Sequence, residues 1–162
     1  MINIRDARPE DLKRLTEIYN WAVINTTASF DLSEQTVEKR AVWFSHYGGK
    51  HPLIVAEVDG IVAGYSSLSK FREKEGYDQT AEISVYVHPE YHRKGIGTML
   101  MEKIISRGRE LGHHVIVAGI TSGNDVSVKM HEKFGFKFCA HFKEVGFKFG
   151  KWQDCLFYQL IL

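Results

Sequence analysis

The stretch AEISVYVHPEYHRKGIGTML, residues 81–100, places a strand-like run before a turn of basic residues and glycines. The alternation and β-branched side chains of its first seven residues favour a strand, and the run after the glycines has the pattern of a helix. Gly95 and Gly97 let the backbone turn tightly and approach a ligand closely. Arg93 and Lys94 stand beside the start of that helix, where free N–H groups attract anions. The stretch therefore predicts an anion-binding turn between a strand and a helix.

Two common nucleotide motifs do not account for this turn. A P-loop requires Gly-x-x-x-x-Gly-Lys-Ser/Thr, which the sequence lacks. A dinucleotide fingerprint requires a third glycine and a later acidic residue on a parallel strand, and the third glycine is missing.

Composition limits the class of protein and its partners. The 162 residues are 44% apolar and 25% charged, which predicts a single globular domain over residues 1–162. A net charge of +1 gives no support to nucleic acid or an anionic membrane as the main partner, and no apolar run is long enough for a membrane span. Cys139 and Cys155 are expected to be buried free thiols, which suits a cytoplasmic location.

Working outward from the opening stretch, seven strands and four helices are expected. The strands cover residues 2–7, 53–58, 61–69, 80–87, 114–120, 136–142 and 155–162. Helices are expected from Pro9, from Asp31 with Ser33 as N-cap, after the glycine turn as far as Gly112, and over residues 124–134. This order predicts an α/β fold with a mixed central sheet of about seven strands and helices on both faces.

Two blocks of sequence carry a family resemblance. The turn resembles the pyrophosphate loop of the GNAT superfamily of N-acetyltransferases, Arg/Gln-x-x-Gly-x-Gly/Ala, with His92 at its first position. The segment NDVSVKMHEKFGF, residues 124–136, is similar to that family's Asn-x-x-Ala/Ser-x-x-Leu-Tyr-x-Lys-x-Gly-Phe helix. Within the superfamily, GYDQTAEISVYV (76–87), VKMHEKFGF (128–136) and VGFKFGKWQD (145–154) resemble the phosphinothricin and methionine sulfoximine acetyltransferase-like branch.

The resemblance implies the GNAT fold and acetyl-CoA as co-substrate. Backbone groups of residues 85–87 would face the pantetheine arm, residues 93–98 would cradle the pyrophosphate, and Asn124 would lie near the thiol end. The implied cofactor-binding residues are Val85, Tyr86, Val87, Arg93, Lys94, Gly95, Ile96, Gly97, Thr98 and Asn124.

Two side chains are candidates for proton transfer. An amine with a pKa of about 8–10 is mostly protonated at pH 7, so a base must take its proton before it attacks a thioester. Glu82 is the first candidate, on the strand face that it shares with Ser84 and Tyr86. His131 stands where much of the superfamily has a tyrosine acting as general acid, and imidazole can give or take a proton. Which of the two is the base and which is the acid stays open. It also stays open whether Glu82 is only an exposed carboxylate and whether His131 has only a structural role.

A metal site is not expected, because Pro89 interrupts the helix that would pair His88 with His92. The acceptor pocket is expected from the loop before Glu82 and from the C-terminal segment, with cations and aromatic walls that suit an amino acid's carboxylate and a second polar end. These expected substrate-binding residues are Arg72, Tyr77, Lys148 and Trp152.

The resemblance implies transfer of acetyl to the α-amine of a small acceptor such as phosphinothricin, methionine sulfoximine or methionine sulfone. A protein or peptide N-acetyltransferase and a non-catalytic acetyl-CoA-binding module are the alternatives. The resemblance also implies a homodimer, for which the aromatic C-terminal strand offers an interface.

Overall fold

The computed structural model describes all residues from 1 to 162. Its strands are β1 (Ile2–Asp6), β2 (Leu53–Val58), β3 (Ile61–Lys70), β4 (Thr80–Val87), β5 (Val115–Thr121), β6 (Lys137–Lys148) and β7 (Lys151–Ile161). Its helices are α1 (Leu12–Asn25), α2 (Val37–Ser45), α3 (Ile96–Glu110) and α4 (Asp125–Lys133). The predicted order of strands and helices is confirmed.

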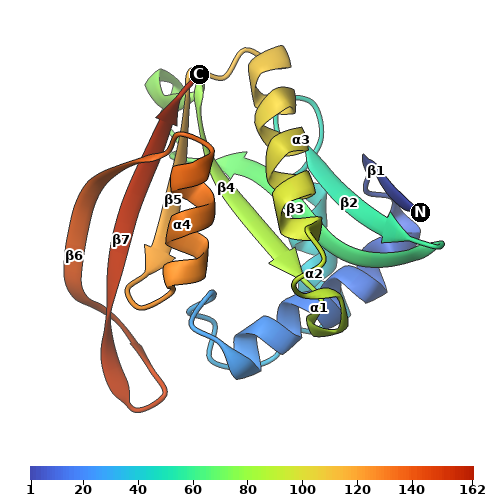
Figure 1. Ribbon diagram of the computed structural model, residues 1–162, viewed down its shortest axis with the longest axis horizontal. Helices are drawn as coiled ribbons and strands as arrows, with labels where there is room; N and C mark the ends of the chain where they lie inside the picture. The colour runs from blue at the N-terminus through green and yellow to red at the C-terminus, as the bar shows by residue number, and fades with distance from the viewer.

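The strands form one mixed sheet in the order β1-β2-β3-β4-β5-β7-β6. All neighbouring pairs are antiparallel except β4 and β5, which are parallel. The β2–β3 hairpin turns at Asp59 and Gly60, as predicted, with both residues at positive φ. At the other edge, β6 and β7 form a long hairpin that extends away from the rest of the molecule (Figure 1).

Helices cover both faces of the sheet. Figure 1 shows α3 and α4 on the near side of the sheet, and a core of 16 buried residues lies on that side. A second core of six buried residues joins α1 to β2 and β3 on the opposite face. Along β4, Val85 and Val87 pack against the first core and Tyr86 packs against the second, so the predicted alternation of faces is confirmed. No helix is long and apolar enough to cross a membrane.

The start of α2 was predicted wrongly. The helix begins at Val37, and its N-cap is Thr36, whose hydroxyl accepts a hydrogen bond of 3.1 Å from the Lys39 N–H. Residue 35 cannot join the helix because the Asn20 side chain holds both of its backbone groups, donating to the Gln35 carbonyl at 3.0 Å and accepting from its N–H at 2.8 Å. A tertiary contact with α1 therefore sets the boundary that Ser33 was expected to set.

The last two strands and the cysteines also differ from the expectation. Both strands are longer than predicted, because β6 continues to Lys148 and β7 starts at Lys151, around a turn with positive φ at Phe149 and Gly150. The prediction that both thiols are buried is wrong. Cys139 is exposed on β6, which is the edge strand of the sheet, and Cys155 is half-buried.

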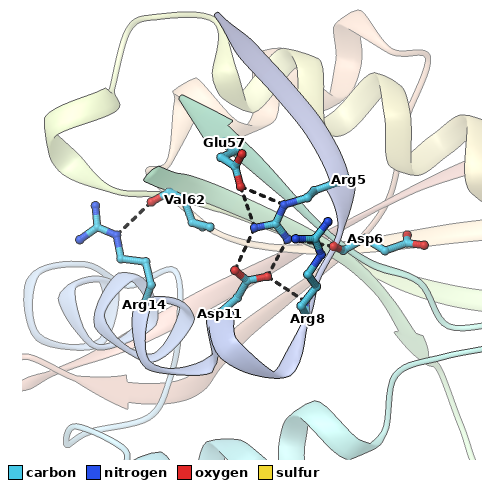
Figure 2. A network of polar contacts seen from close by, with 7 residues as sticks. All are labelled: Arg5, Asp6, Arg8, Asp11, Arg14, Glu57 and Val62. Carbon is cyan, nitrogen blue, oxygen red and sulfur yellow. Dashed lines mark hydrogen bonds and ion pairs between the residues drawn. The ribbon is translucent and has the colours of Figure 1, made fainter. Parts of the chain in front are cut away.

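An ionic network fastens the N-terminal segment to the sheet. Figure 2 shows the Arg5 guanidinium between two carboxylates, 2.8 Å from Asp11 and 2.7 Å from Glu57. Arg5 donates two hydrogen bonds to Asp11, and the Arg8 N–H donates a third, at 2.8 Å. Burial alone would raise the pKa of Asp11, but the hydrogen bonds from Arg5 and Arg8 outweigh it, so that pKa lies below its usual range.

We predict that Arg5→Met lowers the free energy of unfolding by about 3 kcal/mol, the low end for a broken buried ion pair, because Asp11 keeps its charge without its cation. The folded-state pKa of Asp11 is depressed. Its stabilising contribution is therefore present above about pH 3.9, the usual pKa of aspartate, and is lost as pH falls through the lower folded value. The gap between wild type and variant should narrow in acid, as measured by urea unfolding between pH 3 and 7.

Arg8→Ala is the matched control, because it removes a cation from the same turn and keeps the N–H that binds Asp11. A loss in Arg5→Met no larger than the loss in Arg8→Ala would contradict this account.

Candidate active site

The parallel pairing of β4 with β5 ends after three residue pairs. Thr80, Ala81 and Glu82 lie opposite Val115, Ile116 and Val117, and no pairing follows. Because β4 continues to Val87 and β5 continues to Thr121, the facing N–H and C=O groups of both strands have no strand partner beyond that point. Backbone groups of this kind need partners, so the gap is suited to an elongated ligand that pairs with them.

The segment after α1 spans the open end of this gap. The Tyr86 hydroxyl of β4 donates to the Ala28 carbonyl at 3.3 Å, and the Thr121 hydroxyl of β5 donates to the Thr27 carbonyl at 2.7 Å. The ends of the two strands are thus joined through the same loop and not to each other.

A cavity of about 600 Å³ occupies the gap. Its lining includes nine of the ten predicted cofactor-binding residues: Val85, Tyr86, Val87, Arg93, Gly95, Ile96, Gly97, Thr98 and Asn124. Lys94 is the exception, and its ammonium group lies 5.2 Å from the centre of the Tyr91 ring. The volume is within the range of small-molecule sites.

The glycine turn shapes one end of the cavity. Gly95 is the N-cap of α3 and has a φ of +78°, a left-handed conformation that glycine adopts without strain. A Cβ atom on Gly97 would lie 3.6 Å from the Met130 sulfur. The His92 side chain links the turn to the end of β4, because its Nε2 atom lies 2.8 Å from the Val87 carbonyl oxygen. The first N–H groups of α3 therefore remain available to an anion at the positive end of the helix.

Glu82 lies on the strand just where the two strands begin to separate. It is partly buried, and no side chain donates a hydrogen bond to its carboxylate. Burial raises the pKa of Glu82, and the charge of Arg72 opposes that shift. A carboxylate with a raised pKa is a stronger base than an exposed glutamate. Glu82 lines neither cavity itself, but its neighbour Ser84 lines both.

His131 lies on α4, is 6% exposed, and lines the first cavity. Its Nδ1 atom is 2.7 Å from the Ser127 carbonyl oxygen, which can only accept, so Nδ1 carries the proton and Nε2 is the free acceptor. Burial lowers the pKa of His131, although the hydrogen bond to Ser127 works in the opposite direction. The neutral ring is therefore arranged to accept a proton at Nε2.

A second cavity, of about 690 Å³, lies on the opposite face of β4 between the sheet and α1 and α2. Aromatic, hydroxyl and charged side chains line it: Tyr19, Arg40, Trp43, His46, Tyr47, His51, Tyr65, Ser67, Ser69, Lys70, Glu73, Ser84 and Tyr86. Ser84 and Tyr86 belong to both cavities, so the two meet at the middle of β4. The two cavities are therefore adjacent at this strand.

The structure does not bring the four expected acceptor residues together. Arg72 and Tyr77 are exposed neighbours, 5.9 Å apart from guanidinium to ring centre, and Arg72 influences Glu82. Lys148 is 3% exposed, and its ammonium group donates to the Ser29 carbonyl at 2.6 Å. Trp152 is 62% exposed and packs against Phe147 on the β6–β7 hairpin. None of the four lines either cavity.

Several residues that line the cavities were not anticipated from sequence. Trp21 and Thr26 line the first cavity together with residues 118–121 of β5, and Arg40 and Ser67 line the second. Trp21 lies outside the apolar stripe of its helix. A large aromatic residue at such a position is the one feature of the sequence that could have indicated a role in the site. No group of three or more His, Cys, Asp and Glu side chains could hold a metal ion.

The sequence and the fold are similar to those of known acetyltransferases. Residues 15–136 match the family model described as Acetyltransferase (GNAT) family. The chain is 40% identical to the L-methionine sulfoximine/L-methionine sulfone acetyltransferase of Salmonella typhimurium, over 99% of this chain and 95% of the relative.

Two solved structures extend the comparison. The ribosomal-protein-alanine N-acetyltransferase of Brucella melitensis is 42% identical, with a TM-score of 0.96 over 99% of both chains. The structure of yncA from Salmonella typhimurium with its cofactor acetyl-CoA is 40% identical, with a TM-score of 0.95 over 99% of this chain and 94% of that one.

We predict that Gly95→Val raises the dissociation constant of acetyl-CoA at least about ten-fold, because a β-branched residue does not tolerate the left-handed conformation of the turn. Calorimetric titration of acetyl-CoA measures the effect. Gly112→Val is the matched control, since Gly112 has a φ of +82° at the far end of α3 and also faces open space. Gly112→Val should lose stability and keep its affinity for acetyl-CoA. Equal affinities in both variants would remove the turn from the binding site.

Proposed function

Because the chain belongs to the acetyltransferase (GNAT) family, we propose that it transfers acetyl from acetyl-CoA to the α-amine of a small amino-acid-like acceptor. The observation that carries the proposal is that two cavities share Ser84 and Tyr86, one of them lined by the glycine turn and the other by polar side chains. The acceptors proposed are methionine sulfoximine, methionine sulfone and phosphinothricin, in line with the relative named for the first two.

The first cavity fits the extended shape and the charge of acetyl-CoA. The backbone edges of residues 83–86 and 118–120, which lack a strand partner across the gap, are suited to the amides of the pantetheine arm, as a strand would be. The N–H groups of residues 93–98 and the Arg93 side chain are suited to the pyrophosphate. When bound, acetyl-CoA supplies an acetyl group that its thioester already activates. The protein then has to position and deprotonate the amine.

Glu82 is proposed as the base that takes the proton of the amine. Its position beside Ser84, its partial burial and its raised pKa support this role. His131 is proposed as a second proton acceptor inside the first cavity, because its Nε2 atom is unprotonated in the neutral ring. Arg72 and Tyr77 are proposed to flank the acceptor entrance, next to Lys70 and Glu73 of the second cavity.

An acetyltransferase acting on a protein or peptide amine is the second candidate. The Brucella melitensis structure, described as a ribosomal-protein-alanine N-acetyltransferase, is the observation that favours it. The second cavity, of about 690 Å³ with charged and hydroxyl side chains in its lining, is within the size range of small-molecule sites and supports the small acceptor instead.

The proposal includes a homodimer in the cytoplasm. Exposed apolar side chains gather on the β6–β7 hairpin: Phe138, Phe142, Val145, Phe147, Phe149, Trp152 and Ile161. A patch of this kind is typical of a protein–protein interface, and the two free cysteines suit a reducing compartment.

We predict that Glu82→Gln lowers kcat by a factor on the order of 10²–10⁴ and leaves acetyl-CoA affinity unchanged, since Glu82 acts on the amine. In wild type, kcat/KM should rise with pH on an acid limb above about pH 4.3, the usual pKa of glutamate, because burial raises the pKa of Glu82. Steady-state thiol release measures kcat and kcat/KM, and calorimetric titration measures the affinity for acetyl-CoA. Glu102→Gln, which removes an exposed carboxylate on α3 that lines neither cavity, should change neither value much. A Glu82→Gln enzyme with wild-type turnover across pH would end this assignment.

The acceptor class is tested by thiol release with methionine sulfoximine, methionine sulfone, phosphinothricin, a lysine peptide and a polyamine. The first three should have kcat/KM values at least about ten-fold higher than the last two, because each well-placed charge-assisted hydrogen bond contributes roughly 1.5–3 kcal/mol. If the peptide has the highest kcat/KM, the enzyme is a peptide acetyltransferase and the small-acceptor proposal is wrong.

A further inference from the structure

Arg40 is a buried cation without a counterion. It is the one buried residue of α2 and is 5% exposed. No carboxylate lies within the 4.0 Å of a salt bridge, although buried charges are normally paired. Asp31 is linked to this group only through Tyr19, whose ring lies against the guanidinium and whose hydroxyl hydrogen-bonds to Asp31.

The surroundings of Arg40 fix its guanidinium and leave donors free. The Trp43 ring centre lies 3.5 Å from the guanidinium carbon and the Tyr19 ring centre lies 3.9 Å from it, so two rings stack on the group. Hydrogen bonds can then form only along its edge. One edge donor, Nη2, is bonded to the Tyr65 hydroxyl at 3.1 Å, while Nε is buried and has no partner.

A second unpartnered group lies in the same cavity. The hydroxyl of Ser67, which is 1% exposed, has no hydrogen-bond partner. Ser67 and Arg40 line the second cavity together with Ser84, the residue shared with the acetyl-CoA side. Ser67 is paired with Ser84 across β3 and β4, so the two side chains lie on one face of the sheet. A buried polar group that lacks a partner calls for an explanation, and a ligand in this cavity would supply one.

We propose that Arg40, assisted by Ser67, binds the carboxylate of the acceptor. This inference rests on the proposed function and identifies the residues that select an amino acid over a simple amine. A carboxylate supplies both the negative charge that Arg40 lacks and acceptor oxygens for its edge donors and for the Ser67 hydroxyl. The cavity has room for a small amino acid between Arg40 and the middle of β4.

The test compares methionine sulfone with its carboxamide, which keeps the amine and the sulfone and loses the negative charge. Wild type should prefer the carboxylate, and Arg40→Gln should reduce the ratio of the two kcat/KM values at least about ten-fold. Using the ratio cancels the lower pKa of the amine in the carboxamide. Lys39→Gln is the matched control, because it removes an exposed cation from the preceding position of the same helix. This variant should keep the wild-type ratio.

Ser67→Ala provides a second variant in case Arg40→Gln is poorly folded. The Ser67 hydroxyl has no partner within the protein, so its removal should leave the melting temperature unchanged and raise KM for methionine sulfone several-fold. A purely structural role of Ser67 would move the melting temperature and not KM.

Melting curves separate this inference from the proposed function. Methionine sulfone should raise the melting temperature of wild type and of Lys39→Gln, and not that of Arg40→Gln. If wild type releases no thiol with methionine sulfone, the proposed acceptor is wrong, and the melting shift alone decides whether Arg40 binds the carboxylate. Two outcomes overturn the inference. In one, Arg40→Gln keeps the wild-type preference for methionine sulfone over its carboxamide; in the other, wild type has no such preference.

Discussion

The early end of the β4–β5 pairing is the constraint on which the site depends. Strands in a sheet normally satisfy one another's backbone groups, and here only three residue pairs of the parallel ladder do so. The strands then separate while each stays paired on its other side, β4 with β3 and β5 with β7. The sheet therefore remains continuous and still offers a slot whose two edges carry unused donors and acceptors. An extended chain of amides is the ligand shape that such a slot fits.

The segment after α1 keeps this slot open from the side. Donors from three strands reach consecutive carbonyls of the segment: Thr121 binds Thr27, Tyr86 binds Ala28, and Lys148 binds Ser29. A loop that runs across the end of two separated strands has no ladder of its own to satisfy its carbonyl groups. Hydroxyl and ammonium side chains therefore take the place of strand neighbours. This accounts for a buried lysine that faces a backbone oxygen and no carboxylate.

Features encoded within a short stretch could be predicted from the sequence, and contacts between distant segments could not. The Asp59-Gly60 hairpin, the glycine turn and the alternating faces of β4 each depend on residues a few positions apart. The N-cap of α2 depends on Asn20, and the burial of Lys148 depends on Ser29, 119 residues away. The second cavity likewise joins α2 to β3, and no local pattern marks a pairing of that kind.

The two positively charged groups proposed to bind substrates lie on opposite faces of β4. The turn before α3 collects positive charge on one face, and Arg40 carries it on the other, in a chain whose net charge is only +1. A base on the Arg40 face would lose strength if it paired with that guanidinium, because an adjacent cation lowers the pKa of a carboxylate. Burial, opposed only by Arg72, sets the pKa of Glu82, and the Arg40 guanidinium is instead held between two aromatic rings. This arrangement leaves the carboxylate basic and the guanidinium available to an anion.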